Sequence, residues 1–396
     1  MPIHYSPIYF LHYFLKREAS QFFASVAIRY LALGMVLIFE PIYLYLYFER
    51  SLPSTLLFFG VIHGLYGILV VYGGKIMAKI GLKHSMLFSH FFFFGYYLCL
   101  FFLYRSFLFI PLAIILKVLG MTLFWPAFHT DFARFSEKDH RGMEVGKMNI
   151  AMLVPVVVSP IIGGWILTAF NYPVLFMVVL IILFASAIPL FLSKEIHEIY
   201  TDSYKKAWSR IFKKGNRKTS LAFAFNGMEV AMNAYLWPIF MFILAIQYSV
   251  MGGITSFALG FSAFFTLYMG KMTDTINRPR LLNIGSFLTS VAWIIKYFVV
   301  TPFGAFLSHT LYRISRTTAG IPFQTLFYEK AALKGAETDE FIIYREIIIN
   351  ISRFFLFLVL AIFFFFVPKI NIAFIIAAIF SLGFMLLEEP SKFKRK

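Results

Sequence analysis

Basic side chains stand deep inside segments of the chain that are otherwise apolar. Arg313 and Arg316 interrupt the stretch "PFGAFLSHTLYRISRTTAGIPF", and Lys117 interrupts "FIPLAIILKVLGMTLFWP". Lys117 and Arg313 are 196 residues apart, and each precedes a proline by nine residues. A guanidinium forms two parallel hydrogen bonds to a carboxylate or a phosphate. We therefore expect these cations to form a clamp for an anion.

Helical spacing gathers further polar residues on single faces. One set recurs at i, i+3, i+7 and i+11 and comprises Asn226, Glu229, Asn233 and Trp237. A second set, at i, i+4 and i+7, comprises His309, Arg313 and Arg316. In an α-helix these spacings place each set on one face.

Two acidic residues, Glu40 and Glu229, also lie in apolar segments. Burial disfavours a charged carboxylate, so both are candidate proton carriers. A substrate anion and a proton would compete for the same charge network, which is a physical route to coupled movement. The alternative is that these residues form ion pairs which only hold helices together. The candidate pairs are Arg29–Glu229 and Glu40–Lys117.

The composition requires lipid as the solvent for much of the surface. Of the 396 residues, 60% are hydrophobic and 14% are charged, whereas about 25% are charged in soluble domains. A bilayer core of about 30 Å needs roughly 20 apolar residues per helix. That length predicts an all-α, polytopic membrane protein with twelve spans, at 22–47, 55–78, 85–104, 107–132, 146–169, 173–193, 221–246, 252–270, 281–300, 303–327, 346–367 and 371–387.

Positive charge marks one side of this predicted membrane protein. The two terminal segments and the loops on their side hold 27 of the 36 lysines and arginines, and the opposite loops hold three. Cytoplasmic loops carry such an excess, so we expect a multi-pass protein of the cytoplasmic (inner) cell membrane with both termini inside. The net charge of +17 then requires no nucleic acid. The run "KKAWSRIFKKGNRK" predicts an amphipathic helix on anionic headgroups, or a solvated linker.

The chain has the pattern of a doubled unit. Matches at an offset of 196 residues pair Tyr72 with Tyr268, Gly74 with Gly270, Lys75 with Lys271, and Pro126 with Pro322. Six spans is an even number, so the halves share one orientation, as in transporters with parallel repeats. We expect a six-helix bundle over 1–193, a basic cytoplasmic linker over 194–219 and a second six-helix bundle over 220–396.

Four short motifs give the chain a resemblance to the major facilitator superfamily over essentially its full length. They are "GKMTDTINRPR", "GKIMAKIGLKH", "HRGMEVGKMN" and "PVVVSPIIGG". The last is similar to an antiporter motif through Pro160, Gly163 and Gly164, which implies exchange and efflux. The resemblance also implies two pseudo-symmetric six-helix bundles, with helices 1, 4, 7 and 10 around a central cavity. It implies gating residues, which are here Gly74, Lys79, Gly81, Asp131, Arg141, Gly270 and Asp274.

Together these patterns predict a substrate site about 15 Å deep, near the middle of the membrane. Its expected residues are Arg29, Lys117, Trp125, Asn233, Trp237, His309, Arg313, Arg316 and Gln324, with Glu40 and Glu229 as proton carriers. No histidine spacing indicates a metal, and no cofactor is expected.

The expected function is gradient-driven transport of a small anionic or amphiphilic solute by a monomer, with a proton or another ion as the coupling partner. No Gly-Lys pair is followed by Ser or Thr, which excludes an ATP-hydrolysing P-loop. One alternative is an efflux carrier for lipophilic drugs or lysolipids. Two others are a lipid-modifying membrane enzyme and a scaffold that transports nothing.

Overall fold

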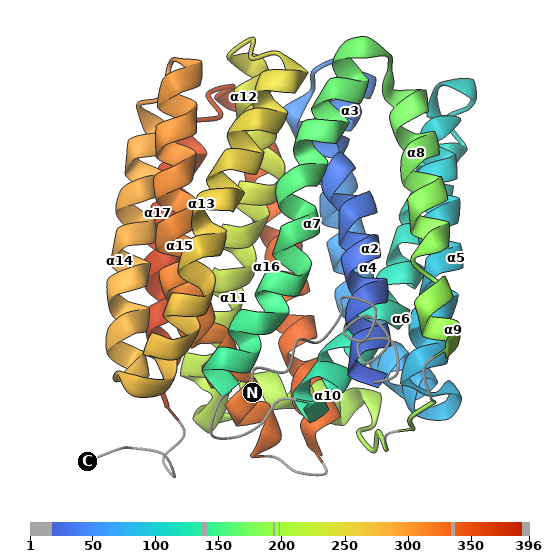
Figure 1. Ribbon diagram of the computed structural model, residues 1–396, viewed down its shortest axis with the longest axis vertical. Coiled ribbons are helices and arrows are strands. Elements are labelled where there is room, and N and C mark those ends of the chain that lie inside the picture. Colours follow the sequence, from blue (N-terminus) through green and yellow to red (C-terminus); the bar gives the residue numbers. More distant parts are fainter. Residues whose placement is uncertain (1–17, 136–140, 193–194, 198, 334–336, 390–396) are drawn as a thin grey trace, which may run out of the picture.

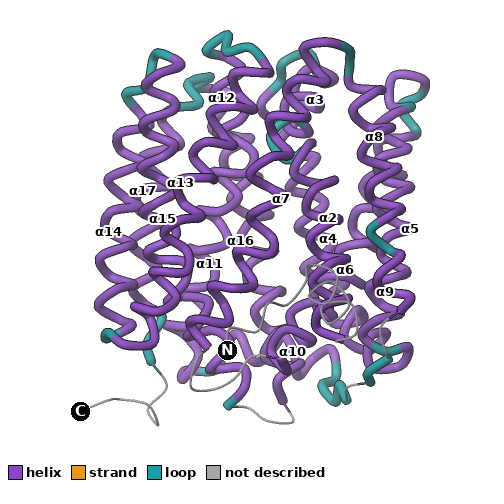
Figure 2. The backbone as a smooth tube through the Cα atoms, viewed as in Figure 1, coloured by secondary structure: helices purple, strands orange, loops and turns teal. Residues whose placement is uncertain are grey.

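The computed structural model describes residues 18–135, 141–192, 195–197, 199–333 and 337–389. Within these residues the chain is helical and contains no strand. Figure 2 shows the helices running between two ends of the molecule, where most of the loops gather. The all-α prediction is therefore confirmed.

Within the described residues the helices make twelve passes between these ends, as predicted (Figure 1). The first six passes are α2 (Glu18–Val36) continued by α3 (Glu40–Tyr47), α4 (Leu52–Ile80), α5 (Leu82–Phe101), α6 (Phe109–Phe135), α7 (Arg141–Ala169), and α8 (Tyr172–Ala185) continued by α9 (Ile188–Leu192). The next six are α11 (Arg217–Ala231) continued by η3 (Met232–Leu236) and α12 (Trp237–Ile243), α13 (Tyr248–Thr275), α14 (Arg278–Tyr297), α15 (Pro302–Ala332), α16 (Thr338–Phe366) and α17 (Ile372–Leu382).

Seven helices of the described residues are long and apolar enough to cross a membrane by themselves. The other passes are either more polar or, as in Ile372–Leu386, apolar but shorter. Helix α15 has 31 residues, enough to span a bilayer, but it contains His309, Arg313 and Arg316. Polar residues in spanning helices usually face protein or a water-filled cavity. The low hydropathy of α15 therefore indicates that its charged side chains face the interior of the molecule.

Prolines break the first and seventh passes at comparable points. Pro41 stands in the first turn of α3, and Pro238 stands in the first turn of α12. Proline has no N–H to bond to the preceding turn, and the regular α-helix is interrupted just before each proline, by a turn over 37–39 and by η3. The turn before Pro238, η3, is π-helical, and such turns are frequent at functional sites. It carries Asn233 and Tyr235, both of which line the cavity described below.

The first six passes meet the last six along two helix pairs. Helix α7 packs along α13, and α4 packs along α16. Glycines permit the close contact of α7 with α13, because a Cβ on Gly164 would overlap the carbonyl of Tyr248. In the same way, a Cβ on Gly252 would overlap the carbonyl of Pro160. These pairs hold the halves together and leave the space between α2, α6, α11 and α15 for a cavity.

Helix α16 begins at Thr338, eight residues before the predicted start of this span. Its first turn contains Asp339 and Glu340, and carboxylates are favourable at the positive end of the helix dipole. The acidic residues that make this segment look like a loop therefore stabilise the start of the helix. As a result Arg345 and Glu346 lie within the helix and face the interior.

The basic linker between the halves contains a short helix, α10 (Tyr204–Phe212). The Ser203 hydroxyl caps it by accepting a hydrogen bond of 3.3 Å from the Lys206 N–H. Arg210 donates two hydrogen bonds, of 2.5 and 3.0 Å, to Asp202 and a third of 3.1 Å to Glu337. Burial by itself raises the pKa of Asp202, but the Arg210 guanidinium outweighs it and lowers that pKa below its ordinary value. These contacts fasten the linker to the chain just before α16.

Candidate functional site

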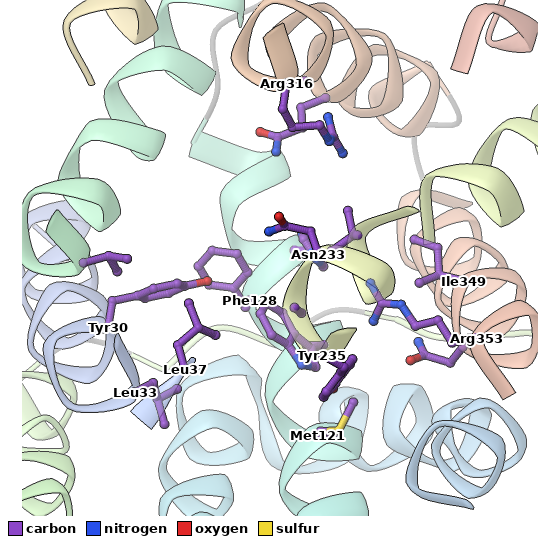
Figure 3. Close-up of a pocket in the computed structure, with 18 of the residues that line it drawn as sticks. Tyr30, Leu33, Leu37, Met121, Phe128, Asn233, Tyr235, Arg316, Ile349 and Arg353 are labelled. Atoms are coloured by element: carbon purple, nitrogen blue, oxygen red, sulfur yellow. The ribbon is translucent and has the colours of Figure 1, made fainter. Parts of the chain in front are cut away.

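A cavity of about 630 Å³ lies between the two halves. Drug-sized ligands occupy pockets of about 300–1,000 Å³, so this cavity has the volume for one such molecule. Figure 3 shows Tyr30 and Met121 of the first half on its wall, with Asn233, Arg316 and Arg353 of the second. In this view Asn233 lies between the two arginines.

Basic side chains outnumber acidic ones among the described residues that line the cavity. Six are basic: Arg29, Lys117, Arg313, Arg316, Arg345 and Arg353. Two are acidic: Glu40 and Glu346. A third carboxylate, Glu229, is buried behind Arg316, so three positive charges still have no acidic counterpart. A cleft lined mainly by one sign of charge attracts ions of the other sign. The electrostatics of the cavity therefore favour an anion.

The Glu229 carboxylate is fully buried and accepts three hydrogen bonds. Oε1 accepts from the Trp293 indole N–H at 2.9 Å and from the Tyr312 hydroxyl at 2.8 Å. Oε2 accepts from Arg316 Nε at 3.1 Å. Three donors satisfy a charged carboxylate in a buried site. The alternative Arg29–Glu229 pair is not formed, and Arg316 takes the place of Arg29.

Glu40 occupies an analogous environment in the first half. Its carboxylate accepts hydrogen bonds from the Tyr96 hydroxyl at 2.9 Å and the Tyr97 hydroxyl at 3.1 Å. Lys117 Nζ lies 3.4 Å from Glu40 Oε1 and 4.2 Å from the centre of the Tyr96 ring. The alternative ion pair of Glu40 with Lys117 is therefore present. Each half thus holds one buried carboxylate with two aromatic donors and one cation.

Arg29 and Arg313 have no carboxylate within 4 Å among the described residues, although both line the cavity. The Arg29 guanidinium lies over the rings of Phe93 and Phe124, at 4.3 and 3.9 Å from their centres. One terminal nitrogen of Arg29 and the Nε of Arg313 are buried without a hydrogen-bond partner. Buried donors are ordinarily paired with an acceptor. These two arginines therefore keep buried donor atoms without a protein acceptor beside the cavity.

A second polar network, which the sequence does not predict, lies on the wall formed by α4 and α16. Glu346 accepts hydrogen bonds from Arg345 at 2.7 Å and from the Tyr66 hydroxyl at 2.9 Å. One helical turn further on, the Asn350 side chain bonds to both Glu346 and His63. The network joins helices of the two halves. The sequence does not predict this network because α16 begins earlier than expected, so that Arg345 and Glu346 fall at the edge of the predicted span.

Lys296 is a further buried cation that the sequence does not single out. It is completely buried in the last turn of α14, and its Nζ donates to Asn233 Oδ1 at 3.1 Å. A lysine near the end of a spanning helix ordinarily extends its side chain to the membrane surface. That ordinary role makes the position inconspicuous in the sequence.

The remaining predicted substrate residues divide into two groups. Trp125, Asn233 and Gln324 line the cavity. Trp237 and His309 do not belong to its lining: both are buried, and their rings stack on each other at 5.5 Å. The helical face that carries them therefore continues from the cavity into the packed interior of the second half.

The residues predicted to act in gating in the first half lie around the C-terminal ends of α4 and α6. Gly81 has a φ of +92°, and a Cβ there would overlap the Glu195 carboxylate, which accepts hydrogen bonds from the start of α5. Gly74 packs closely against Ile343 of α16, and Asp131 is buried. Lys79 is exposed in the last turn of α4. Gly81 and Gly74 thus occupy positions where a side chain would disturb contacts with the linker or the other half.

The equivalent loop of the second half forms a charge cluster. Gly270 is buried in α13, and Asp274 lies 3.8 Å from Arg278. Arg278 also forms an ion pair with Glu329 of α15. Arg141 begins α7, but its side chain lies outside the described part of the structure. This cluster joins the ends of α13, α14 and α15, the position expected of a gating contact.

Among the described residues, no group of three or more histidine, cysteine, aspartate or glutamate side chains could hold a metal ion.

The family model described as "Major Facilitator Superfamily" matches residues 22–336. No curated protein matches the chain significantly. The human organic anion transporter MFSD10 (TETRAN) has a similar structure, with a TM-score of 0.72, 11% identity and coverage of 94% of this chain and 99% of that one. The Escherichia coli fucose:proton symporter FucP gives a TM-score of 0.65, 13% identity and coverage of 93% and 97%.

Proposed function

The chain belongs to the Major Facilitator Superfamily and is a multi-pass membrane transporter, not an enzyme, and we propose that it carries a drug-sized organic anion across the membrane together with protons. The observation that carries this proposal is the positive excess in the cavity, with donors of Arg29 and Arg313 that no side chain satisfies. In transporters with parallel repeats, the substrate binds near the middle of the membrane between the repeats. Rocking of the two halves then opens the site to one side at a time.

The charges offer a simple means of recognition. Arg313 and Arg316 stand three residues apart on α15, and within the described part of the chain Arg316 is paired with a carboxylate, Glu229, whereas Arg313 is not. An anion that approaches Arg313 meets a guanidinium that needs an acceptor. The aromatic side chains on the wall, among them Tyr30 and Trp125, provide apolar contact for the body of the molecule. The substrate class that fits both features is an aromatic or amphiphilic carboxylate, sulfonate or phosphate.

Glu40 and Glu229 are the proposed proton carriers. A proton on Glu229 neutralises the partner of Arg316 and releases that guanidinium for the substrate. A proton on Glu40 releases Lys117 in the same way. Proton binding thus increases the positive charge available to an anion, so the two assist each other and move in one direction, in contrast to the competition expected from the sequence. The motif around Pro160 favours the opposite arrangement, exchange and efflux, and the direction of proton movement during transport distinguishes the two.

The proposal includes the setting of the protein. We infer that it lies in the cell membrane as a monomer, that both termini are cytoplasmic, and that its basic linker faces anionic headgroups. The linker helix α10 carries exposed Lys205 and Lys206, and Phe212, whose side chain is 78% exposed, stands at its end. This combination suits the boundary between headgroups and acyl chains. Nucleic acid is not needed to account for the charge.

A thermal-shift screen with three naphthalene compounds tests the substrate class. Naphthalene-1-sulfonate, 1-naphthalenemethanol and 1-naphthylmethylammonium share a ring system and differ in charge. We expect the sulfonate to raise the melting temperature of the purified protein, because a ligand that binds only the folded state stabilises it. The alcohol and the ammonium should have little effect. Equal stabilisation by the neutral alcohol would instead favour a carrier of lipophilic molecules.

A further inference from the structure

Aromatic rings enclose the side chain of Lys296. Its Nζ lies 3.8 Å from the centre of the Tyr312 ring and 4.2 Å from the centres of Trp237 and Trp293. The only hydrogen bond that Nζ makes within the described structure is the one to Asn233. The side chain is completely buried. The group is thus a lysine in a cage of three aromatic rings, closed by one amide oxygen.

Opposing effects act on the charge of this amine. Transfer of an unpaired ammonium from water into a protein interior is unfavourable, and no carboxylate of the described residues lies within 4 Å of Nζ. Cation–π contact with three rings favours the charged form. A buried lysine changes protonation readily because its charge depends on such surroundings. Small changes near the cage are therefore sufficient to add or remove the proton.

The cage is connected to the transport cavity by two routes. Asn233, which accepts from Lys296, also lines the cavity. Trp293 and Tyr312 form two walls of the cage and donate to Glu229, the partner of Arg316. Binding of a substrate at the cavity wall therefore changes the surroundings of Lys296 through the Asn233 amide on one side and the Glu229 carboxylate on the other.

The other charged and titratable groups around the cage come from the helices packed on α14. Helix α11 contributes Glu229, and α15 contributes His309 and Arg313. Helix α17 contributes only an aromatic ring, Phe374, against Trp293. Lys296 is thus the titratable amine of a cluster whose other cation, Arg313, keeps its charge at any physiological pH.

We propose that Lys296 is a proton-binding residue of the transport cycle. The inference deepens the proposed function, on which it rests. An anion beside Arg313 and Asn233 attracts positive charge, so the Lys296 amine takes one proton from water when the substrate binds. When the substrate leaves, the attraction is lost and the ammonium returns that proton to water. Substrate and proton then move together.

Two substitutions of Lys296 and one matched control test this role. K296R keeps a cation in the cage but cannot release its proton, and K296M has a similar length without a titratable group. K369R makes the same exchange at an exposed lysine in the loop before α17. Proton uptake is measured in weakly buffered solution on adding naphthalene-1-sulfonate to the purified protein. We expect uptake in wild type and K369R, and uptake that is smaller by about one proton per bound sulfonate in both Lys296 variants, where any remaining uptake belongs to Glu40 and Glu229. Unchanged uptake in variants that still bind the sulfonate would overturn the proposal.

A second measurement requires no substrate. Protonated amines quench tryptophan emission, so a change in the charge of Lys296 alters the fluorescence of Trp237 and Trp293. The pH titration of emission should contain a step in wild type and K369R that is missing in K296R and K296M. Persistence of this same step, with an unchanged midpoint, in both Lys296 variants would contradict the role of Lys296; a step from Glu229, which accepts from Trp293, would be present in all four proteins. Failure of wild type to bind the sulfonate, with this step present, would count against the proposed anion specificity alone.

Discussion

Replacing Arg313 or Arg316 with glutamine separates the two roles that an arginine can have in this cavity. Arg313 has no carboxylate partner in the described structure, and its Nε is buried without an acceptor. Arg316 forms an ion pair of 3.1 Å with Glu229, whose side chain is 0% exposed. We therefore propose that Arg313, which lines the cavity, contacts the ligand, whereas Arg316 is already engaged by Glu229. We expect R313Q to change affinity and R316Q to change stability.

The magnitudes follow from these partners. A hydrogen bond to a charged group contributes about 1.5–3 kcal/mol, so R313Q should weaken binding of naphthalene-1-sulfonate by about 10- to 150-fold. Removing one partner of a buried ion pair costs about 3–5 kcal/mol. R316Q should fall at the lower end of that range, because 17% of the Arg316 side chain is exposed and Glu229 keeps its bonds from Trp293 and Tyr312.

Isothermal titration calorimetry gives the affinity, and thermal denaturation without ligand gives the stability. R313Q should melt at or above the wild-type temperature, since it removes a buried cation that has no partner. R316Q should melt several degrees lower. The reasoning is refuted if R313Q binds the sulfonate as tightly as wild type, or if the two variants lose stability equally.

Three other changes have defined outcomes. G81A should lower the stability of the protein by about 1–3 kcal/mol, because φ is +92° and a Cβ would overlap Glu195; an unchanged melting curve would show that the loop adapts. E229Q should abolish the stimulation of sulfonate uptake by a proton gradient in liposomes, and full retention of that stimulation would remove Glu229 from the coupling mechanism. Burial raises the pKa of Asp202, but the Arg210 guanidinium outweighs this effect, so the pKa is lowered in the folded state. The Asp202 carboxylate therefore helps to hold the linker above about pH 4, and this contribution is lost as the pH falls through the lowered pKa. Proteolysis of the linker by pepsin should therefore accelerate below about pH 4 in wild type, whereas D202N should be cleaved readily throughout and without such a step.

The fold was predictable because apolar length alone defines most of the passes. Helix α16 departs from the prediction at its start, where Asp339 and Glu340 resemble loop residues in the sequence but stabilise the first turn in the structure. The division at 1–193, 194–219 and 220–396 stays a prediction. This division was inferred from the internal repeat. The repeat indicates how the helices are arranged, but it does not define a domain boundary at a particular residue.

The cavity was predictable in its charges but not in their partners. The offset of 196 residues between Lys117 and Arg313 placed both on one site, and both line the cavity. Pairing depends on contacts between helices that are distant in sequence, so periodicity did not reveal that Glu229 bonds to Arg316 and not to Arg29. The sequence did not single out Lys296 for a related reason. A lysine in the last turn of a spanning helix can extend to the membrane surface or turn inward, and the sequence pattern is the same in both cases.

Uptake by liposomes containing the purified protein tests the central proposal of organic anion transport most directly. Naphthalene-1-sulfonate should enter these liposomes faster than protein-free ones, with saturation at high concentration and with acceleration when the outside is more acidic than the inside. The matched cation, 1-naphthylmethylammonium, should show no such difference. Sulfonate uptake equal to that of protein-free liposomes, or equally fast carrier-dependent entry of the cation, would contradict the proposal.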